Sequence, residues 1–263
     1  MQSIERLLGI MQRLRDPDKG CPWDQAQTYR SIVPHTLEEA YEVADAIERE
    51  DYVELRDELG DLLFQVVFYA QLASEEGRFD FAEVATAIAD KLERRHPHVF
   101  ADSHFATAEE QTRHWEDLKA QERAQKSAED KQSILDGVAR TMPALSLAHK
   151  LQKRAAQVGF DWPHHTDVVA KVQEELTELE QDWTDPDRRE DEIGDVLFSV
   201  VNLARHAGCD PEQALRRASR KFERRFRDME TVCHAQQRRL EQCTAEELEA
   251  QWQAIKKMHD NSA

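Results

Sequence analysis

Two short acidic patterns occur in the same order at two places in this chain. The first copy reads EEAYE at 38–42 and ELGD at 58–61, and the second reads EELTE at 174–178 and EIGD at 192–195. Carboxylates three residues apart share one face of a helix. The ELGD and EIGD patterns each lead directly into an apolar run, so the helices that carry them must be largely buried. The chain is therefore predicted to contain two copies of one helical unit.

The acidic residues of the first copy have the chemistry of a metal site. If two helices pack antiparallel, their carboxylates converge on one point, and hard oxygen donors there suit Mg²⁺. Four facing carboxylates repel one another and require cations to neutralise them. A single E-x-x-E pattern is most often only a solvated helix face, but the repetition favours the metal site. We therefore expect Mg²⁺ as the cofactor, bound by Glu39, Glu42, Glu58 and Asp61.

The charge balance restricts the partners of the chain. Lys and Arg total 35 against 53 Asp and Glu, which gives a net charge of −18. A phosphate-backbone binder needs a basic face, so no nucleic acid is expected as a main partner. Neither G-x-x-x-x-G-K-[ST] nor G-x-G-x-x-G occurs, so no glycine-rich loop is available to hold phosphates. Any phosphate chemistry must therefore use metal ions and side-chain cations.

The cysteines and the apolar runs bear on localisation. The four cysteines form no C-x-x-C pair, and a disulfide framework is not expected in a chain of this size. Charged residues interrupt the apolar residues of 1–14, unlike a signal peptide, and no run of eighteen apolar residues occurs. We therefore expect a cytoplasmic, soluble protein with reduced thiols and no membrane partner.

The helical periodicity covers nearly the whole chain, and no β-alternation of useful length occurs, so the fold is predicted to be all-α. The first acidic helix is expected to begin near Pro34 to Leu37, because proline is tolerated near a helix start. The polar stretch 121–133 has almost no apolar periodicity and marks a boundary. We expect an N-terminal domain at 1–122, a linker at 123–133 and a C-terminal domain at 134–263.

Basic and aromatic residues follow each acidic pair in a repeated order. KLERR at 91–95 matches KFERR at 221–225, and a Trp/Lys pair follows in both halves. Lys221 and Arg225 are one helical turn apart, which suits a polyphosphate. Trp252 is a candidate to stack on a base, with Lys256 one turn on, although a structural set of salt bridges with a core Trp252 is the alternative. Metal, cations and an aromatic side chain together describe a nucleoside triphosphate.

The doubled E-E-x-x-E and E-x-x-D patterns, CPWD at 21–24 and K-[LF]-E-R-R after each copy closely resemble the MazG family of bacterial nucleoside triphosphate pyrophosphohydrolases. The acidic motif alone marks only the wider all-α NTP pyrophosphatase superfamily, but the tandem arrangement and LERRHPHVF at 92–100 look specific to MazG. The resemblance covers essentially the entire chain. It implies two tandem helical bundles, Mg²⁺-dependent cleavage between the α and β phosphates, broad base tolerance, a housecleaning or stress-nucleotide role and a homodimer.

The same resemblance assigns residues in the second copy. The implied metal ligands are Glu175, Glu178, Glu192 and Asp195. The implied nucleotide contacts are Lys221, Arg225, Trp252 and Lys256, and the matching positions of the first copy are Lys91, Arg95, Trp115 and Lys119. A metal-bound water would attack phosphorus in line. The candidates for its general base are Glu174 and Glu175, with Glu38 and Glu39 at the matching positions of the first copy.

The two copies are expected to differ in activity. Pro97 ends the first cationic helix directly after Arg95, whereas the second can continue past Arg225, so we expect the C-terminal copy to carry most hydrolysis. Two other functions stay open. One is a narrower pyrophosphatase of the same superfamily, devoted to dUTP, dCTP or phosphoribosyl-ATP. The other is a non-catalytic module that binds a Mg²⁺-nucleotide or a protein partner.

Overall fold

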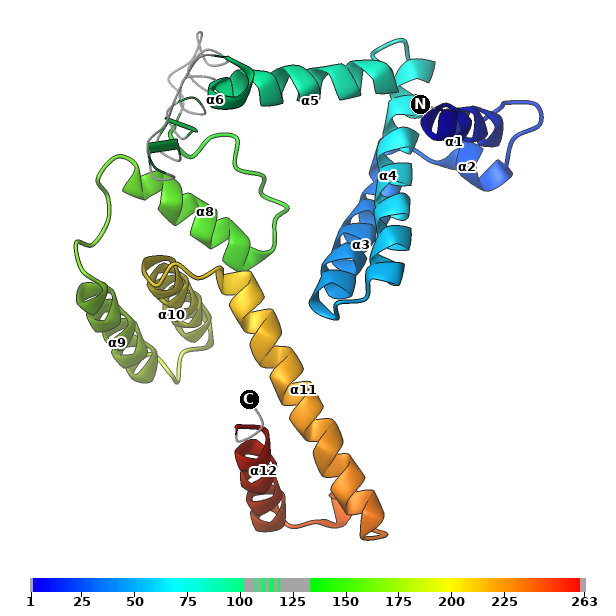
Figure 1. Cartoon of the computed structure of the whole chain (residues 1–263). Coiled ribbons are helices and arrows are strands. Elements are labelled where there is room, and N and C mark those ends of the chain that lie inside the picture. The colour runs from blue at the N-terminus through cyan, green and yellow to red at the C-terminus, as the bar shows by residue number, and fades with distance from the viewer. Residues whose placement is uncertain are drawn as a thin grey trace. The chain divides into compact units, whose positions relative to one another are not determined.

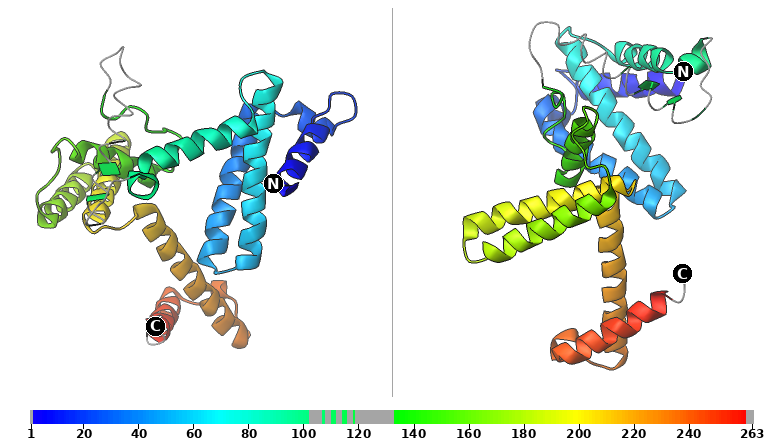
Figure 2. Two further views of the ribbon diagram at one scale, coloured as in Figure 1. Left: turned by 45° about the horizontal axis from the view of Figure 1, so that its top comes forward. Right: turned by 90° about the vertical axis from the view of Figure 1, so that its left-hand side faces the viewer.

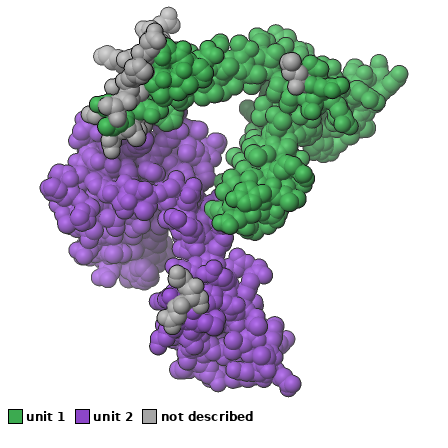
Figure 3. Space-filling view, in the orientation of Figure 1, with its two compact units in different colours: residues 1–128 green, residues 129–263 purple. Residues whose placement is uncertain are grey.

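The computed structural model describes residues 2–101, the single positions 107, 110, 111, 114, 115 and 118, and residues 133–260. Within these residues the chain consists of helices joined by short connections, and no strand is present (Figure 1). The all-α prediction is therefore confirmed. The chain divides into two compact units, 1–128 and 129–263, which Figure 3 colours separately. No helix in the described residues is both long and apolar enough to cross a membrane.

Unit 1 is organised around an antiparallel pair of long helices. Its helices are α1 (Gln2–Leu14), α2 (Pro22–Ala26), α3 (Tyr29–Glu48), α4 (Tyr52–Glu75), α5 (Phe81–Arg95) and α6 (Pro97–Phe100). α3 and α4 lie side by side in Figures 1 and 2, and α1 packs on α4. The α3–α4 connection is short, and Asp51 within it caps α4 by accepting hydrogen bonds from the backbone N–H groups of Val53 and Glu54.

The start of α3 differs from the prediction. The helix begins at Tyr29, and Pro34 lies inside it rather than in its first turn. Thr28 and Ser31 form a capping box, in which each side chain bonds to the backbone N–H of the other residue. This cap satisfies two N–H groups that would otherwise lack partners, and it therefore defines a better helix start than the proline does.

Apolar side chains from three helices form the core of unit 1. Met11 of α1, Ile32 of α3, and Val67, Phe68 and Leu72 of α4 make one buried cluster. Each such side chain contributes roughly 1.5–3 kcal/mol when it is fully buried. The cluster therefore fixes α1 and α3 against the same stretch of α4.

Unit 2 repeats the antiparallel pair. Its elements are α8 (Ala144–Ala156), α9 (His165–Gln181), α10 (Pro186–His206), α11 (Pro211–Ala235), the short 3₁₀ helix η1 (Leu240–Gln242) and α12 (Ala245–Asp260). α9 and α10 lie side by side, and α8 packs on α10 (Figures 1 and 2). α12 folds back on α11. Asp185 and Asp210 cap α10 and α11, each directly before a proline at the first helical position.

Candidate metal and nucleotide site

The acidic patterns of unit 1 meet between α3 and α4. Glu39, Glu58 and Asp61 each offer an oxygen within 4.8 Å of the others. Partial burial, followed by the charges of Asp61, Glu42 and Glu58, raises the pKa of Glu39. Burial, followed by the charges of Glu42 and Asp61, also raises the pKa of Glu58. The fold thus brings the carboxylates of the two facing helices together, as the spacing predicted. Glu42 lies next to the group of three carboxylates.

Unit 2 assembles the same group between α9 and α10. Glu175, Glu192 and Asp195 offer oxygens within 4.8 Å of one another, and Glu175 is only 6% exposed. Burial and then the charge of Glu175 raise the pKa of Glu178. Burial and then Glu178 and Asp195 raise the pKa of Glu192. One buried oxygen of Glu192, Oε2, has no hydrogen-bond partner. An orphaned carboxylate oxygen in an acidic cluster fits a hard divalent cation.

A lysine that the sequence analysis did not single out joins the second cluster. Lys171 Nζ lies 2.8 Å from a carboxylate oxygen of Glu174 and 2.8 Å from one of Glu175. These hydrogen bonds raise the pKa of Lys171. The i, i+3 and i, i+4 spacing of the three residues was the available signal. The matching residue of unit 1 is His35, whose Nδ1 lies 3.5 Å from Glu38. The two clusters therefore differ in their cationic neighbour.

The two general-base candidates in each unit occupy different environments. Glu38 and Glu174 are exposed at the edge of their clusters, with side chains 62% and 56% accessible. Glu39 is half-buried and Glu175 is buried, and both contribute oxygens to the group of three carboxylates. The inner glutamate is therefore placed to hold a cation, whereas the outer one faces solvent.

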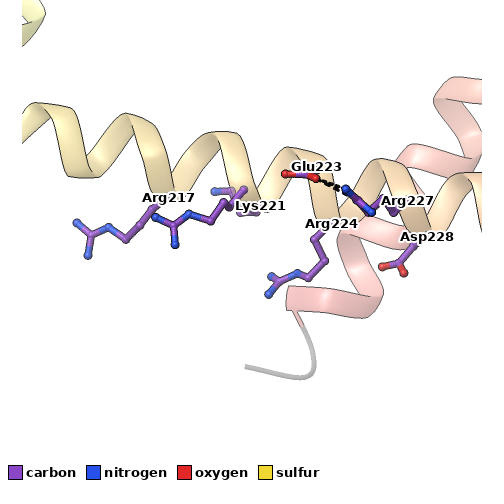
Figure 4. Close-up of a pocket in the computed structure, with 7 residues that line it drawn as sticks. Arg217, Lys221, Glu223, Arg224, Arg227 and Asp228 are labelled. Atoms are coloured by element: carbon purple, nitrogen blue, oxygen red, sulfur yellow. Dashed lines mark hydrogen bonds and ion pairs between the residues drawn. The ribbon is translucent and has the colours of Figure 1, made fainter. Parts of the chain in front are cut away.

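The predicted cations and tryptophan of the second copy lie on α11 and α12. Lys221 is exposed and lines an open groove of about 530 Å³. Figure 4 shows Arg217, Lys221 and Arg224 extending from one side of α11 into this groove. Glu223 and Arg227 also line the groove and pair with each other. The groove is mostly cationic, as a polyphosphate would require.

Arg225 occupies a different environment from Lys221. Its side chain is 8% exposed, and its guanidinium donates to Asp260 of α12 at 2.7 Å. Trp252 is half-buried, with its ring 5.2 Å from that of Phe222, and Lys256 is exposed. Arg225 and Trp252 thus hold α12 against α11.

In Figures 1 and 2, α12 lies at the part of α11 that points away from α9 and α10. Within one chain, α12 is therefore apart from the carboxylate cluster.

The matching residues of unit 1 are less fully defined. Lys91 is exposed and Arg95 is half-buried at the end of α5, and Trp115 is 41% exposed. Lys119 lies outside the described residues. α5 ends at Arg95 and a new short helix begins at Pro97, whereas α11 continues to Ala235. The predicted difference between the two cationic helices is therefore confirmed.

A family model and several known proteins match this chain over the segments that carry the two clusters. A family model described as the MazG nucleotide pyrophosphohydrolase domain matches residues 27–100 and 164–230. The nucleoside triphosphate pyrophosphohydrolase of Escherichia coli K12 is 54% identical over 261 residues, 98% of each chain. The nucleoside triphosphate pyrophosphohydrolase/pyrophosphatase MazG of Thermotoga maritima is 44% identical over 253 residues, 96% of this chain and 95% of that protein. A crystal structure of a mazG-related protein from Thermotoga maritima aligns at a TM-score of 0.38 and 28% identity, over 44% of this chain and 98% of that one.

The two matched segments contain every carboxylate of both clusters. The match extends over nearly the full length of the E. coli relative. This chain is therefore a member of the MazG nucleotide pyrophosphohydrolase family.

Proposed function

We propose that this chain is a Mg²⁺-dependent hydrolase that cleaves nucleoside triphosphates between the α and β phosphates. The products are a nucleoside monophosphate and pyrophosphate. The duplicated carboxylate cluster carries the proposal, because each unit brings three carboxylate oxygens from facing helices within 4.8 Å of one another. The names of the E. coli and Thermotoga relatives describe this class of hydrolase.

The metal ligands of unit 2 would be Glu175, Glu178, Glu192 and Asp195, and those of unit 1 would be Glu39, Glu42, Glu58 and Asp61. The unpartnered Oε2 of Glu192 supports this assignment, because a buried anionic oxygen without a donor needs a cation. When bound, Mg²⁺ supplies charge neutralisation and polarises phosphate oxygens. The all-carboxylate ligand set suits hard divalent cations in general, and Mg²⁺ is the one that carboxylates commonly hold together with substrate phosphates.

The outer glutamates are the better general bases. Glu174 is exposed, is hydrogen-bonded to Lys171 and lies outside the group of three carboxylates, so it could take a proton from an attacking water without removing a ligand from the metal. Glu38 occupies the matching position in unit 1 beside His35. Glu175 and Glu39 remain the alternatives in each unit, but their oxygens belong to the groups of three carboxylates.

We assign most of the hydrolysis to unit 2. Its cluster has a lysine 2.8 Å from two carboxylates, and its cationic helix runs without interruption past Lys221 and Arg225. Exposed Lys221 and Lys256 would be the cations for the pyrophosphate leaving group, supplied by the second chain of the proposed homodimer, since α12 is apart from the carboxylate cluster of its own chain. Buried Arg225 supports them by holding α12 in place. The matching cations of unit 1 are on the shorter α5.

A homodimer is part of the proposal. α3 and α4 carry large apolar side chains that are exposed in the single chain, among them Leu37, Tyr41, Leu59 and Val66. Exposed apolar residues grouped on packed helices are typical of a surface that another subunit covers. We also propose a cytoplasmic housecleaning or stress-nucleotide role, which the four free cysteines and the nucleotide chemistry support.

The test is ³¹P NMR of the purified protein with ATP, dCTP and UTP in excess Mg²⁺. Monophosphate and pyrophosphate from all three would support the broad α–β hydrolase. Turnover of only one nucleotide would favour a narrower pyrophosphatase. Diphosphate with free phosphate would refute the proposed bond, and no turnover would favour a nucleotide-binding module.

A further inference from the structure

Two of the four free cysteines lie in contact at the turn between α11 and α12. Cys233 lies in the last turn of α11, and Cys243 directly follows η1, two residues before α12 begins. Their Sγ atoms are 3.8 Å apart. Cys233 is fully buried and Cys243 is half-buried, so the pair is open to solvent from one side. Cys21 lies in unit 1, and Cys209 is exposed before α11. The proposed nucleotide site uses none of these thiols.

The backbone of the turn fixes the positions of the paired thiols. α11 ends in a Schellman motif, in which Gln237 has the left-handed φ of 56°. The N–H of Arg238 then donates to the backbone carbonyl of Cys233 at 3.0 Å. On the other side of the turn, the N–H of Cys243 donates to the carbonyl of Leu240 at 3.0 Å. Hydrogen-bonded backbone, and not a long irregular loop, therefore brings the two sulfurs together.

Arg238 also attaches this turn to α12. Its guanidinium donates to a carboxylate oxygen of Glu247 and to the backbone carbonyl of Gln242, both at 2.8 Å. Thr244 and Glu247 form a capping box at the start of α12, in which each side chain accepts a hydrogen bond from the backbone N–H of the other residue. Cys243 is therefore held directly before the helix cap, and its sulfur stays beside α11.

Both thiols have hydrogen-bond partners in the reduced state. The thiol of Cys233 donates to Oε1 of Gln251 on α12 at 3.2 Å, and that of Cys243 donates to the carbonyl of Arg239 at 3.7 Å. Burial, followed by the hydrogen bond with Cys233, raises the pKa of the Cys243 thiol, although the nearby guanidinium of Arg238 opposes this shift. A thiol with a raised pKa reacts slowly, so the pair rests as a dithiol until an oxidant is abundant.

We propose that Cys233 and Cys243 form a reversible intramolecular disulfide when a hydroperoxide oxidises the chain, and that this bond staples α12 to α11. An S–S bond of about 2.0 Å requires the two sulfurs, now 3.8 Å apart, to approach by about 1.8 Å. Rotation of the two side chains about their Cα–Cβ bonds can supply a movement of that size. Disulfides in reducing compartments are usually transient and redox-sensing, which fits a pair that rests as thiols. The inference is independent of the proposed hydrolysis.

The oxidation takes place in two steps. The sulfur of Cys243, the more accessible of the two, attacks one oxygen of the peroxide, so that an S–O bond forms and the O–O bond breaks. The product is a sulfenic acid, and the other oxygen leaves as water with the thiol proton. The sulfur of Cys233 then attacks the sulfenic sulfur, so that the S–S bond forms and a second water leaves with the Cys233 proton. The two thiols thus lose two electrons, which reduce one hydrogen peroxide to two waters.

The disulfide would change the turn between α11 and α12 in two ways. It joins residues that are ten positions apart, so it restricts the unfolded chain and should stabilise the folded hairpin. It also removes the S–H donor from Gln251, which directly precedes Trp252. The staple therefore acts at the end of α12 that leads to Trp252 and Lys256.

The test treats the dilute full chain with hydrogen peroxide, alkylates the remaining thiols and maps the tryptic peptides by mass spectrometry without reduction. Trypsin cuts after Arg238 and Arg239, between the two cysteines, so the disulfide leaves two peptides joined. The mass of the chain before alkylation should fall by about 2 Da. The Tm should rise by about 5 °C, and dithiothreitol should reverse both changes. Cys243→Ser should abolish the linked peptides and the rise in Tm, whereas the control Cys209→Ser should keep both.

Three results would overturn the proposal. The first is a disulfide that links Cys209 or Cys21 in place of the pair. The second is a pair that stays reduced, or becomes sulfonic acid without a linked peptide, after treatment that fully oxidises the exposed Cys209. The third is a linked pair that leaves Tm unchanged, because the bond would then not staple the hairpin. The half-buried Cys243 carries the substitution because serine at the buried Cys233 could prevent folding.

Discussion

Replacing Glu175 with glutamine is the sharpest test of the second carboxylate cluster. The amide keeps the size of the side chain and removes its charge. Glu175 is 6% exposed and shares a group of three oxygens within 4.8 Å with Glu192 and Asp195. A unit charge about 4 Å away contributes roughly 4 kcal/mol at an effective dielectric constant of about 20. Solvent at the exposed Asp195 screens part of this energy. We therefore expect Glu175→Gln to weaken metal binding by about 3 kcal/mol, which is roughly 150-fold in affinity.

Glu175→Gln should therefore lower kcat/KM for ATP by about two orders of magnitude at limiting Mg²⁺. The matching change in unit 1, Glu39→Gln, should lower it by less than about fivefold, because unit 2 carries most of the proposed hydrolysis. Glu180→Gln on the exposed face of α9 is the control for charge loss. Pyrophosphate release is followed over a Mg²⁺ titration, with Tm measured with and without Mg²⁺.

Three results would contradict, in turn, the assignment of activity to unit 2, the metal cluster, and the role of Glu175 in metal binding. A larger loss in Glu39→Gln than in Glu175→Gln would refute the assignment of activity to unit 2. Full activity in both variants would refute the metal cluster itself. If Glu175→Gln lowers Tm in EDTA as much as in Mg²⁺, the residue acts in folding rather than in metal binding, and the charge argument fails.

Further substitutions test the neighbouring groups. Lys171→Met should lower kcat/KM about tenfold, because the buried Glu175 loses its cationic partner; unchanged kinetics would remove Lys171 from the site. Arg225→Met should lower the free energy of unfolding by about 1–2 kcal/mol, a value kept small because solvent screens the largely exposed Asp260. Lys221→Met should raise the KM and leave Tm unchanged. The reverse pattern would contradict both assignments. Hydrogen bonds from Arg238 and Thr244 lower the pKa of Glu247 from 4.5 to about 2, so the stability that they contribute should be lost as pH falls from about 4.5 towards 2. Glu247→Gln should flatten the dependence of Tm on pH in that window, and an unchanged slope would show that this pair does not contribute.

The sequence by itself was sufficient for the features that depend on local spacing. Carboxylates three residues apart must share a helix face, so the two clusters followed once the helices were recognised, and the repeat doubled the signal. The interruption at Pro97 was also predictable, because proline cannot continue a helix. By contrast, the true start of α3 depended on a Thr28–Ser31 capping box that outweighed the proline at position 34.

The exposure and the contacts of a side chain, unlike its position along a helix, are decided by tertiary packing. Arg225 and Lys221 are one helical turn apart and read alike in sequence, yet α12 covers Arg225 and leaves Lys221 in an open groove. Cys233 and Cys243 are ten positions apart in the sequence, yet the turn between α11 and α12 brings their sulfurs to 3.8 Å. The sequence therefore determined an all-helical chain with two acidic clusters and the family to which it belongs. Only the folded chain decided which cations stay exposed and which thiols meet, because burial and contact depend on how separate segments of the chain pack.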